Sequence, residues 1–375
     1  MQHEASSDNL NALLSADYID QSSATLKTYS SDMSQISGQY PLAIAFPTTT
    51  TEVAELVRNA SAAGVSLFPR GSGTGLVGGA VPTDKHGIVI STEKMNNIKE
   101  FNQENNVVHA QSGVITQNII NLASSYGLFF PSAPNSSSES TIGGNILHNS
   151  SGPRSYKYGA TRNFVYQIEV VIGTGEVLRL GDPHFRLHPG YNLLDLFIGS
   201  EGTLGIVTEV WLKLLPEPAK RSTLIVEFAD LTEAFRAVQE ISKIDSHISA
   251  IDFIGRDCVL EIQSHSELNV FSDYTNHLVL IEVEYENACT ELRLFECIDK
   301  LSHFQCSHHL EHKLERQHEI WSLRSRIFHL MKAKYNSMRV EDICIPINNL
   351  PLIGQEIDQA AAAHDVNWPA IGNIG

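Results

Sequence analysis

The chain of 375 residues is 42% hydrophobic and 18% charged, a composition typical of a soluble globular protein with ample core material. Its formal net charge of −17, with no lysine-rich run, argues against nucleic acid and anionic membrane surfaces as partners. The sequence shows no leader peptide, no apolar run of transmembrane length, and no C-x-x-C pair among its five cysteines. These features predict a cytoplasmic protein with reduced thiols.

Residues 1–38 are polar, with short helical fragments. Residues 41–71 are then predicted to form a strand, a helix and a strand, and a threonine run supplies the helix N-cap before Glu52. Further strands with glycine turns are expected at 87–92, 107–113 and 165–181, and an amphipathic helix is expected within 114–130, ending near Gly127.

The stretch FPRGSGTGLVGGAVP at 68–82 contains five glycines within nine residues, and Gly73, Gly75 and Gly78 have the spacing G-x-G-x-x-G. A dinucleotide-binding fingerprint with this spacing opens a helix, but here a proline, Gly87 and another predicted strand follow. No Lys-Ser or Lys-Thr pair follows the glycines, so the stretch is not a P-loop. We expect a strand–loop–strand element whose free N–H groups bind an anion, with an ordinary turn as the alternative.

Pro216 and Pro218 mark a boundary, and a second, α+β domain is predicted from about residue 219. Its first helix, within 229–243, has Asp230 as a candidate N-cap and Glu233 three residues later. Strands are expected at 222–228, 248–255 and 277–285, and a further helix at 288–304.

Two more loops resemble the first in kind, at 129–153 and 189–210, and each combines glycines with polar residues. Three such loops in one domain, none followed by a helix suited to NAD, fit an extended dinucleotide. Backbone amides would hold its phosphates, and polar groups of the loops would hold a flavin ring. A disordered Ser/Asn linker is the alternative for 129–153, and the apolar residues within TIGGNIL argue against it.

The motifs PRGSGTGLVGG, TIGGNILHNSSGP, KYG and GSEGTLGIVTE together resemble the FAD-binding half of the PCMH-type (vanillyl-alcohol oxidase) flavoprotein superfamily. Within it, the chain is most similar to D-2-hydroxyacid dehydrogenases: flavin-linked D-lactate dehydrogenase, the FAD subunit of glycolate oxidase and D-2-hydroxyglutarate dehydrogenase. The resemblance implies an α+β protein with an N-terminal polar, helical segment at 1–38 and a two-subdomain FAD-binding PCMH-type domain at 39–218. A ferredoxin-like α+β substrate (cap) domain, incomplete at its C-terminus, would occupy 219–375.

The resemblance also implies roles for individual residues. The cofactor would be FAD, bound non-covalently, because the first loop lacks the histidine or cysteine that tethers the flavin in some relatives. A side chain at Gly75 should strike the pyrophosphate or force a strained backbone. Glu201, Gly202 and Ile206 would close over the cofactor. The other implied cofactor-binding residues are Arg70, Gly71, Ser72, Gly73, Thr74, Gly75, Gly78, Gly79, Pro134, Thr141, Ile142, Gly143, Gly144, Asn145, Asn149, Gly152, Tyr158 and Gly159.

Arg324 lies in IWSLRSRI, which resembles the W-x-x-R-E segment whose arginine binds the substrate carboxylate. A guanidinium suits this task because its fork binds a carboxylate through two parallel hydrogen bonds. A salt bridge on a helix surface is the alternative. Ser325 replaces the usual glutamate, and Phe328 and Val340 lack polar groups that the D-2-hydroxyglutarate branch uses, which favours a smaller hydroxyacid.

Two stretches bear on metal binding. HHLEH at 308–312 matches the pattern H-x-x-E-H, but we expect it on a polar, exposed helix without a catalytic pocket. The last residues resemble the family segment that runs into G-H-x-G-D-G-N-x-H, whose members bind a divalent metal, and Asn373 stands where the first histidine ligand belongs. Metal ligands and the histidine base are therefore expected beyond Gly375, with a divalent metal such as zinc in a full-length protein.

The implied activity is oxidation of a D-2-hydroxyacid (D-lactate-like, D-2-hydroxyglutarate or glycolate) to the 2-oxoacid by hydride transfer to flavin N5. Electrons would leave to a quinone, a cytochrome or an electron-transfer flavoprotein, with the protein in the cytoplasm or peripheral to the inner membrane. This truncated chain alone is expected to be inactive, with His148 as the first base to consider if it is not. Alternatives are a degenerate flavin-binding subunit without turnover and sugar or alcohol oxidation on the same scaffold.

Overall fold

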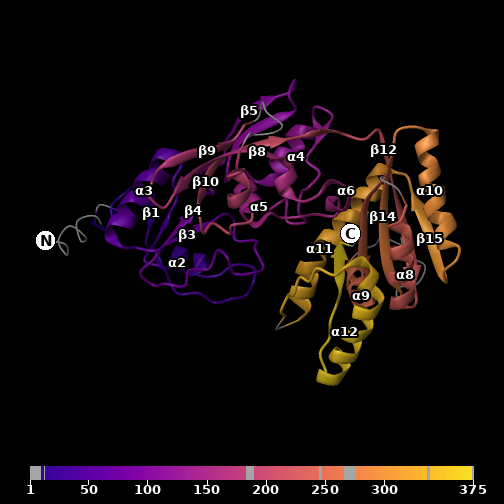
Figure 1. Ribbon diagram of the computed structural model, residues 1–375. Coiled ribbons are helices and arrows are strands. Elements are labelled where there is room, and N and C mark those ends of the chain that lie inside the picture. Colours follow the sequence, from indigo (N-terminus) through magenta and orange to yellow (C-terminus); the bar gives the residue numbers. More distant parts are fainter. Residues whose placement is uncertain are drawn as a thin grey trace. The chain divides into compact units, whose positions relative to one another are not determined.

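The computed structural model describes residues 10–11, 13–182, 190–244, 247–265, 276–335 and 338–373. The chain forms two compact units (Figure 1). Unit 1 consists of Met1–Ser151 and Ala160–Glu217, and unit 2 consists of Gly152–Gly159 and Pro218–Gly375. The chain thus passes from unit 1 to unit 2 between Pro216 and Pro218, and the segment Gly152–Gly159 belongs to unit 2.

The first sheet of unit 1 has the strand order β1 (Ile19–Asp20), β2 (Ala43–Ala45), β4 (Ile88–Ser91), β3 (Leu67–Arg70). Strands β2, β4 and β3 are parallel, and β1 is antiparallel to β2. Helix α2 (Ser23–Tyr29) precedes β2, and helix α3 (Thr50–Ala63) connects β2 to β3. The predicted threonine cap of α3 is confirmed: Thr49 accepts a hydrogen bond from the backbone of Glu52 at 3.2 Å, and Glu52 completes the capping box.

The second sheet of unit 1 is antiparallel, in the order β5 (Ile98–Asn102), β6 (Val107–Gln111), β10 (Gly205–Lys213), β8 (Val165–Ile172), β9 (Val177–Gly181). Helix α4 (Thr116–Ser124) lies against β7 (Leu128–Phe129), which pairs with β11 (Leu215–Pro216). The short helices are α5 (Ile142–His148), η1 (Thr161–Phe164) and α7 (Leu194–Phe197). These two sheets are the two predicted subdomains.

Unit 2 contains an antiparallel sheet in the order β15 (Cys306–Glu311), β12 (Lys220–Phe228), β14 (His277–Tyr285), β13 (Ile248–Ile254), β16 (Ile371–Asn373). Its first four strands in chain order therefore have the spatial order 4-1-3-2, which confirms the ferredoxin-like prediction. The helices are α6 (Ser155–Tyr158), α8 (Leu231–Ile241), α9 (Arg256–Ser264), α10 (Ala288–Leu301), α11 (Leu314–Lys334), η2 (Ile347–Asn349) and α12 (Leu350–His364).

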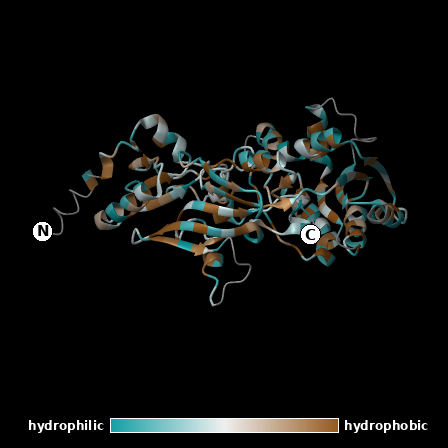
Figure 2. Cartoon of the chain, turned by 90° about the horizontal axis from the view of Figure 1, so that it is seen from above, coloured by the Kyte–Doolittle hydropathy of each residue, from teal (hydrophilic) through white to brown (hydrophobic). Residues whose placement is uncertain are grey.

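Both faces of the unit 2 sheet are covered. One core contains Phe228, Phe235 and Phe253 and lies under α8 and α10. The other core contains Ile254, Leu280 and residues of α9 and α11. Figure 2 shows hydrophobic and hydrophilic residues alternating along the helices of this unit, as expected when each helix turns one face to a sheet. The predicted cap of α8 is confirmed by the hydrogen bond from Glu233 N to Asp230 Oδ1, 2.9 Å.

Two local predictions were wrong. The stretch 308–312 is not helical: most of it belongs to β15, which pairs with β12 so that His308 lies opposite Val226 and Glu311 opposite Thr223. Strand β15 lies at the edge of the sheet, and its histidines face solvent. Its sequence is therefore polar and lacks the apolar pattern from which a strand is predicted. The stretch around residue 145, treated as a loop, contains helix α5, which begins at the N-cap Thr141.

Helix α6 is attached to the unit 2 sheet by charged groups. Arg154 donates from Nε and Nη2 to the two carboxylate oxygens of Glu282 at 2.7 and 2.9 Å. Glu284 accepts hydrogen bonds from Lys157 Nζ at 2.8 Å and from the Tyr158 hydroxyl at 2.5 Å. Burial alone would raise the pKa of Glu282, but Arg154 and its other partners hold it at about 2. Glu282 on β14 therefore binds Arg154 in its ionised form.

Candidate cofactor and substrate sites

The first glycine-rich loop, called here the glycine loop (residues 71–79), follows β3 and reaches β4 without forming a helix. None of its backbone N–H groups donates a hydrogen bond to another described residue. Gly73 and Gly78 have φ of +72° and +77°, conformations that L side chains rarely adopt. The loop thus presents a run of free donors, as predicted for an anion-binding loop.

Gly75 differs from its neighbours. Its φ is not in the left-handed region, and a Cβ built on it meets no atom within 4 Å. The expectation that a side chain there would strain the backbone was therefore wrong, because the strain lies at Gly73 and Gly78. At Gly73 a Cβ would strike the guanidinium of Arg70. The open space at Gly75 is room that a ligand can occupy.

Arg70 shapes the glycine loop from within unit 1. It is 8% exposed, donates from Nη1 to the Ser31 carbonyl at 2.7 Å, and lies over the Tyr29 ring at 4.9 Å. Its Nε is buried and has no partner among the described residues. These two contacts fix the Arg70 side chain, which packs against Gly73, and its Nε is a donor without a partner among the described residues.

The glycine loop meets both other predicted loops. A Cβ on Gly71 would strike the Thr141 hydroxyl, and one on Gly79 would lie 2.6 Å from Glu201 Oε2. Glu201 N donates to the Leu147 carbonyl at 2.9 Å, so the segment 199–206 is attached to α5. These close approaches bring residues about 60 to 130 positions apart in sequence into one place.

Helix α5 is fixed by its polar residues. Thr141 caps it by accepting from Gly144 N at 3.3 Å, and the Asn145 amide donates to Thr116 Oγ1 at 2.6 Å. Asn149 ends the helix with φ +54° and accepts from Arg162 N at 3.1 Å. Gly143 packs against Ser112, where a Cβ would approach Ser112 Cβ to 2.6 Å. The buried residues of this segment include Ile142 and, across the site, Ile206.

Serine hydroxyls around these loops are available to bind a polar ligand. Ser72, Ser112, Ser140 and Ser200 have buried Oγ atoms without a hydrogen-bond partner among the described residues. Each lies in or beside a predicted cofactor segment, and leaving a buried hydroxyl unpaired costs roughly 1–3 kcal/mol. An elongated ligand with phosphate and hydroxyl groups would supply their partners, so the residues present fit a dinucleotide such as FAD.

The remaining predicted cofactor residues make contacts outside the group formed by the glycine loop, α5 and Glu201. Gly202 has φ +75° and packs on Pro69. Pro134 contributes its carbonyl to a turn, accepting from Ser137 N at 3.0 Å. Gly152, Tyr158 and Gly159 belong to unit 2, where the Tyr158 hydroxyl is used by Glu284.

Histidine 148 is paired with one of these residues. His148 Nδ1 lies 2.6 Å from Glu201 Oε1, and both side chains are partly exposed. The pair joins α5 to the segment 199–206. Neither the motif that contains His148 nor the motif that contains Glu201 indicates this contact, so it could not be predicted from the sequence.

Arg324 lies on α11 in unit 2 and is buried, with 5% of its surface exposed. Its Nε donates to Asp252 Oδ2 on β13 at 2.7 Å. Within the described ranges, Nη1 and Nη2 have no hydrogen-bond partner. The exposed-salt-bridge alternative therefore does not describe this residue, because Arg324 is inside the unit and only part of its fork is used.

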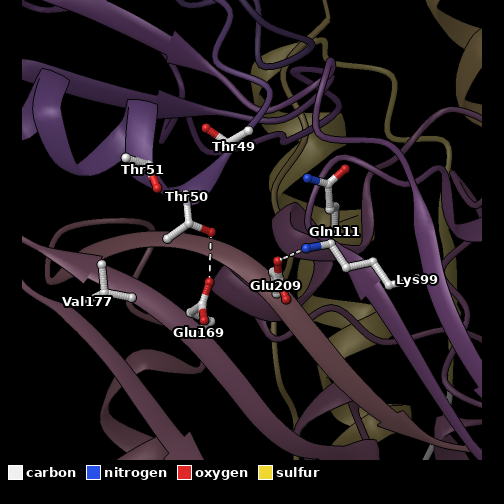
Figure 3. A pocket seen from close by; sticks show the side chains of 8 residues that line it. All are labelled: Thr49, Thr50, Thr51, Lys99, Gln111, Glu169, Val177 and Glu209. Atoms are coloured by element: carbon white, nitrogen blue, oxygen red, sulfur yellow. Dashed lines mark hydrogen bonds and ion pairs between the residues drawn. The ribbon is translucent and has the colours of Figure 1, made fainter.

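Unit 1 also has a polar cavity of about 400 Å³, which the sequence did not suggest (Figure 3). Glu169 and Glu209 lie opposite each other on β8 and β10. Thr50 Oγ1 donates to Glu169 at 2.7 Å, and Lys99 forms an ion pair with Glu209, as the dashed lines in Figure 3 show. His109 Nε2 lies 2.7 Å from Glu209, so both carboxylates are already partnered and the cavity needs no ligand.

The fold and the loops are those of an FAD-binding domain followed by a second α+β unit. A family model described as "FAD binding domain" matches residues 41–181, and one described as "FAD linked oxidases, C-terminal domain" matches residues 217–375. The chain belongs to the PCMH-type (vanillyl-alcohol oxidase) family of FAD-binding oxidoreductases. This confirms the predicted family and fold, and it supports FAD as the cofactor.

Among curated proteins, the chain is 33% identical over 358 residues to "Glycolate oxidase subunit GlcD" of Bacillus subtilis (strain 168), covering 95% of this chain and 76% of that protein. It is 27% identical over 330 residues to "D-lactate dehydrogenase" of Archaeoglobus fulgidus, covering 88% and 72%. It is 29% identical over 364 residues to "D-2-hydroxyglutarate dehydrogenase" of Stutzerimonas stutzeri (strain A1501), covering 94% and 76%.

The solved structures that share the fold include two with TM-scores of 0.77 and 0.79. An alkyldihydroxyacetonephosphate synthase aligns with a TM-score of 0.77 at 21% identity, covering 97% of this chain and 76% of that one. The 4-ethylphenol oxidase from Gulosibacter chungangensis aligns with a TM-score of 0.79 at 14% identity, covering 100% and 80%. At these identities the likeness concerns the fold.

In the described part of the chain, no helix combines the length and the apolar character needed to cross a membrane. No group of three or more histidine, cysteine or acidic side chains is placed there to hold a metal ion. Gly375, where the implied metal motif is interrupted, lies outside the described residues.

Proposed function

We propose that this protein is an FAD-dependent dehydrogenase that oxidises a small D-2-hydroxyacid to the corresponding 2-oxoacid. One observation carries the choice of an acid substrate: Arg324 is buried, and its Nη1 and Nη2 have no partner among the described residues. A guanidinium edge of this kind suits a planar carboxylate, which accepts two parallel hydrogen bonds. The names of the relatives, which include a glycolate oxidase subunit and D-lactate dehydrogenases, support the same class of substrate.

The cofactor would be held by unit 1. The free N–H groups of residues 71–79 would bind the pyrophosphate, and the unpartnered hydroxyls of Ser72, Ser140 and Ser200 would bind polar groups along the dinucleotide. Thr141 and Asn149 fix α5, whose backbone would line the flavin side of the site. Because the glycine loop has no histidine or cysteine, we propose that the FAD is not covalently attached.

In the reaction, bound FAD would supply a two-electron acceptor for the hydride that leaves the substrate's α-carbon, while a general base takes the proton of the hydroxyl group. Arg324 binds the substrate carboxylate and thereby orients the α-carbon. The positive charge of Arg324 also makes binding specific for an anion in a chain whose net charge is −17. We propose that electrons then pass to a quinone, a cytochrome or an electron-transfer flavoprotein.

The neighbours of Arg324 favour a short substrate. One turn further along α11, Phe328 is half-buried and contacts the His329 ring with their centroids 5.5 Å apart. Val340 is 38% exposed and is apolar. Neither side chain can bind a second carboxylate, so we propose that D-lactate or glycolate is preferred over D-2-hydroxyglutarate.

The test is the steady-state kcat/KM for D-lactate, glycolate and D-2-hydroxyglutarate, measured with an artificial electron acceptor and the protein expressed from its complete gene. We expect the highest value for one of the two short acids, and L-lactate serves as the control. A protein that retains FAD but oxidises none of these acids would instead be a flavin-binding subunit. A preference for D-2-hydroxyglutarate would contradict the proposed substrate size.

A further inference from the structure

We propose that Asp252 is a positioning residue: it holds the Arg324 guanidinium so that the Nη1/Nη2 edge is presented to the substrate carboxylate. This inference rests on the proposed role of Arg324 and adds a second residue to the substrate site. No motif of the sequence points to Asp252, which lies 72 positions from Arg324 along the chain.

Asp252 occupies a position that otherwise belongs to apolar residues. Strand β13 is buried along its whole length, and Asp252 has no exposed surface. Its strand neighbours across the sheet are Leu280 on β14 and Asn373 on β16. Ile254, two residues further along β13, packs in the core formed with α9 and α11. Because side chains alternate along a strand, Asp252 and Ile254 share that face.

A buried ion pair in such a place is poorly explained by stability. Removing two charges from water costs several kcal/mol per ion, and replacing such a pair by apolar residues is often neutral or stabilising, by about 1–4 kcal/mol. A leucine at 252 would suit the surrounding core. The carboxylate is therefore better explained by what it does to Arg324.

The geometry of the pair leaves the useful edge of the arginine available. Asp252 uses a single oxygen, Oδ2, and accepts from Nε at 2.7 Å. A guanidinium is planar and rigid, so fixing Nε fixes the direction of Nη1 and Nη2 as well. The second oxygen, Oδ1, is buried and has no partner among the described residues, so Asp252 does not compete for the outer edge of the fork.

Another ion pair on α11 provides a matched control. Lys334 Nζ lies 2.7 Å from Glu261 Oε2 and joins α11 to α9, the helix that packs in the same core. The Lys334 side chain is 40% exposed and that of Glu261 is 13% exposed, so the pair is partly open to solvent, and neither Asp252 nor Arg324 takes part in it. Glu261→Gln therefore removes an α11 ion pair without disturbing Arg324.

The experiment measures the affinity of the FAD-loaded protein for oxalate, a planar carboxylate that has no α-hydrogen to lose. Assays are made at pH 8, where Asp252 is ionised, because burial raises its pKa only to about 6 against the opposing effect of Arg324. We expect Asp252→Ala to weaken oxalate binding at least about tenfold, with FAD content unchanged. Asp252→Asn keeps an acceptor for Nε and should weaken binding less, about threefold, and Glu261→Gln should leave it unchanged.

Removing Asp252 leaves a buried arginine without its partner, so Asp252→Ala could lower the yield of folded protein. In that case Asp252→Asn, which preserves the shape of the side chain, carries the comparison. Oxalate affinity of the folded variants equal to or tighter than that of the wild type would overturn the proposal. That outcome would mean that the carboxylate is structural or that it restrains Arg324 from binding anions.

The role of Arg324 is tested separately by Arg324→Ala. If this variant binds oxalate and oxidises hydroxyacids normally, the proposed function of Arg324 fails. If it loses oxalate while the Asp252 variants do not, only the positioning role fails. We expect Asp252→Asn to have no further effect on oxalate binding in an Arg324→Ala background, because Asp252 acts through Arg324.

Discussion

Gly75→Val separates cofactor binding from folding. A valine Cβ at this position meets no protein atom within 4 Å, and the backbone is not in a conformation that requires glycine. The apo-protein should therefore change little in stability, within about 0.5 kcal/mol, as for an ordinary surface substitution. The branched side chain would project into space next to the free N–H groups of the glycine loop, which we assign to the pyrophosphate.

The expected loss of affinity follows from the number of those donors. A hydrogen bond to a charged group contributes about 1.5–3 kcal/mol. If the valine displaces the phosphates from two N–H groups, the loss is at least about 3 kcal/mol, which corresponds to roughly a hundredfold weaker FAD binding. The loaded protein would also lose the stabilisation that a tightly bound ligand confers on the folded state.

The assay is titration of FAD into apo-protein, followed by flavin fluorescence, with thermal unfolding of both forms. Gly73→Ala is the matched control, because its φ is +72° and its Cβ would strike Arg70. We expect Gly73→Ala to destabilise the apo-protein by about 1–2 kcal/mol, whereas Gly75→Val does not. Normal FAD affinity in Gly75→Val would refute the assignment of the glycine loop to the cofactor.

The remaining predictions concern Arg324, the attachment of the flavin and Glu282. Arg324→Ala should retain FAD but lower kcat/KM for the hydroxyacid at least about tenfold. Arg324→Lys should recover little of this activity, because an ammonium group cannot donate two parallel hydrogen bonds to a carboxylate. Unchanged kinetics of Arg324→Ala would refute the proposed role of Arg324 in substrate binding. Acid precipitation of the loaded protein should leave all flavin in the supernatant, and flavin in the pellet would show a covalent bond. The pKa of Glu282, lowered to about 2 from 4.5, contributes about 3 kcal/mol of stability that is present above pH 4.5 and lost as the pH falls towards 2. The free energy of unfolding of Glu282→Gln should therefore be lower than that of the wild type at pH 7, by up to this amount. It should also fall less when the pH is lowered from 7 to about 3, as urea unfolding at both pH values would show.

Features that depend on neighbouring residues could be predicted from the sequence. The capping box of α3 and the cap of α8 need only a polar residue and a glutamate three positions later, and both were found where expected. The strand–glycine loop–strand element was also predictable, because proline and glycine exclude a helix after the loop. The ferredoxin-like order of unit 2 was inferred from the family resemblance, and the sheet has that order.

Features that depend on residues far apart in the sequence could not be predicted from the sequence. Gly73 and Gly75 look alike in the sequence, and only the backbone of the folded loop shows that Gly73 has a positive φ, +72°, and Gly75 does not. Helix α5 was missed because glycine and asparagine are poor helix formers, and its cap and the Asn145 contact with Thr116 compensate for them.

The residues around Arg324 illustrate the same limit. Asp252 is a single acidic residue in the apolar strand ISAIDFI, which was a usable signal that the strand contains a buried charge needing a partner. Its partner could not be identified without the fold, because β13 and α11 are far apart in the chain. The motif IWSLRSRI indicated Arg324 as a site residue, and the structure shows that Asp252 accepts a hydrogen bond from it.

The central claim is that a D-2-hydroxyacid delivers its hydride to FAD bound by this protein. The most direct measurement is anaerobic mixing of the FAD-loaded protein, expressed from its complete gene, with D-lactate, glycolate or D-2-hydroxyglutarate while the oxidised flavin band is followed. We predict that D-lactate or glycolate bleaches the band within the turnover time of the enzyme and that L-lactate does not. A band that none of the three acids bleaches, although dithionite reduces it fully, would contradict the account.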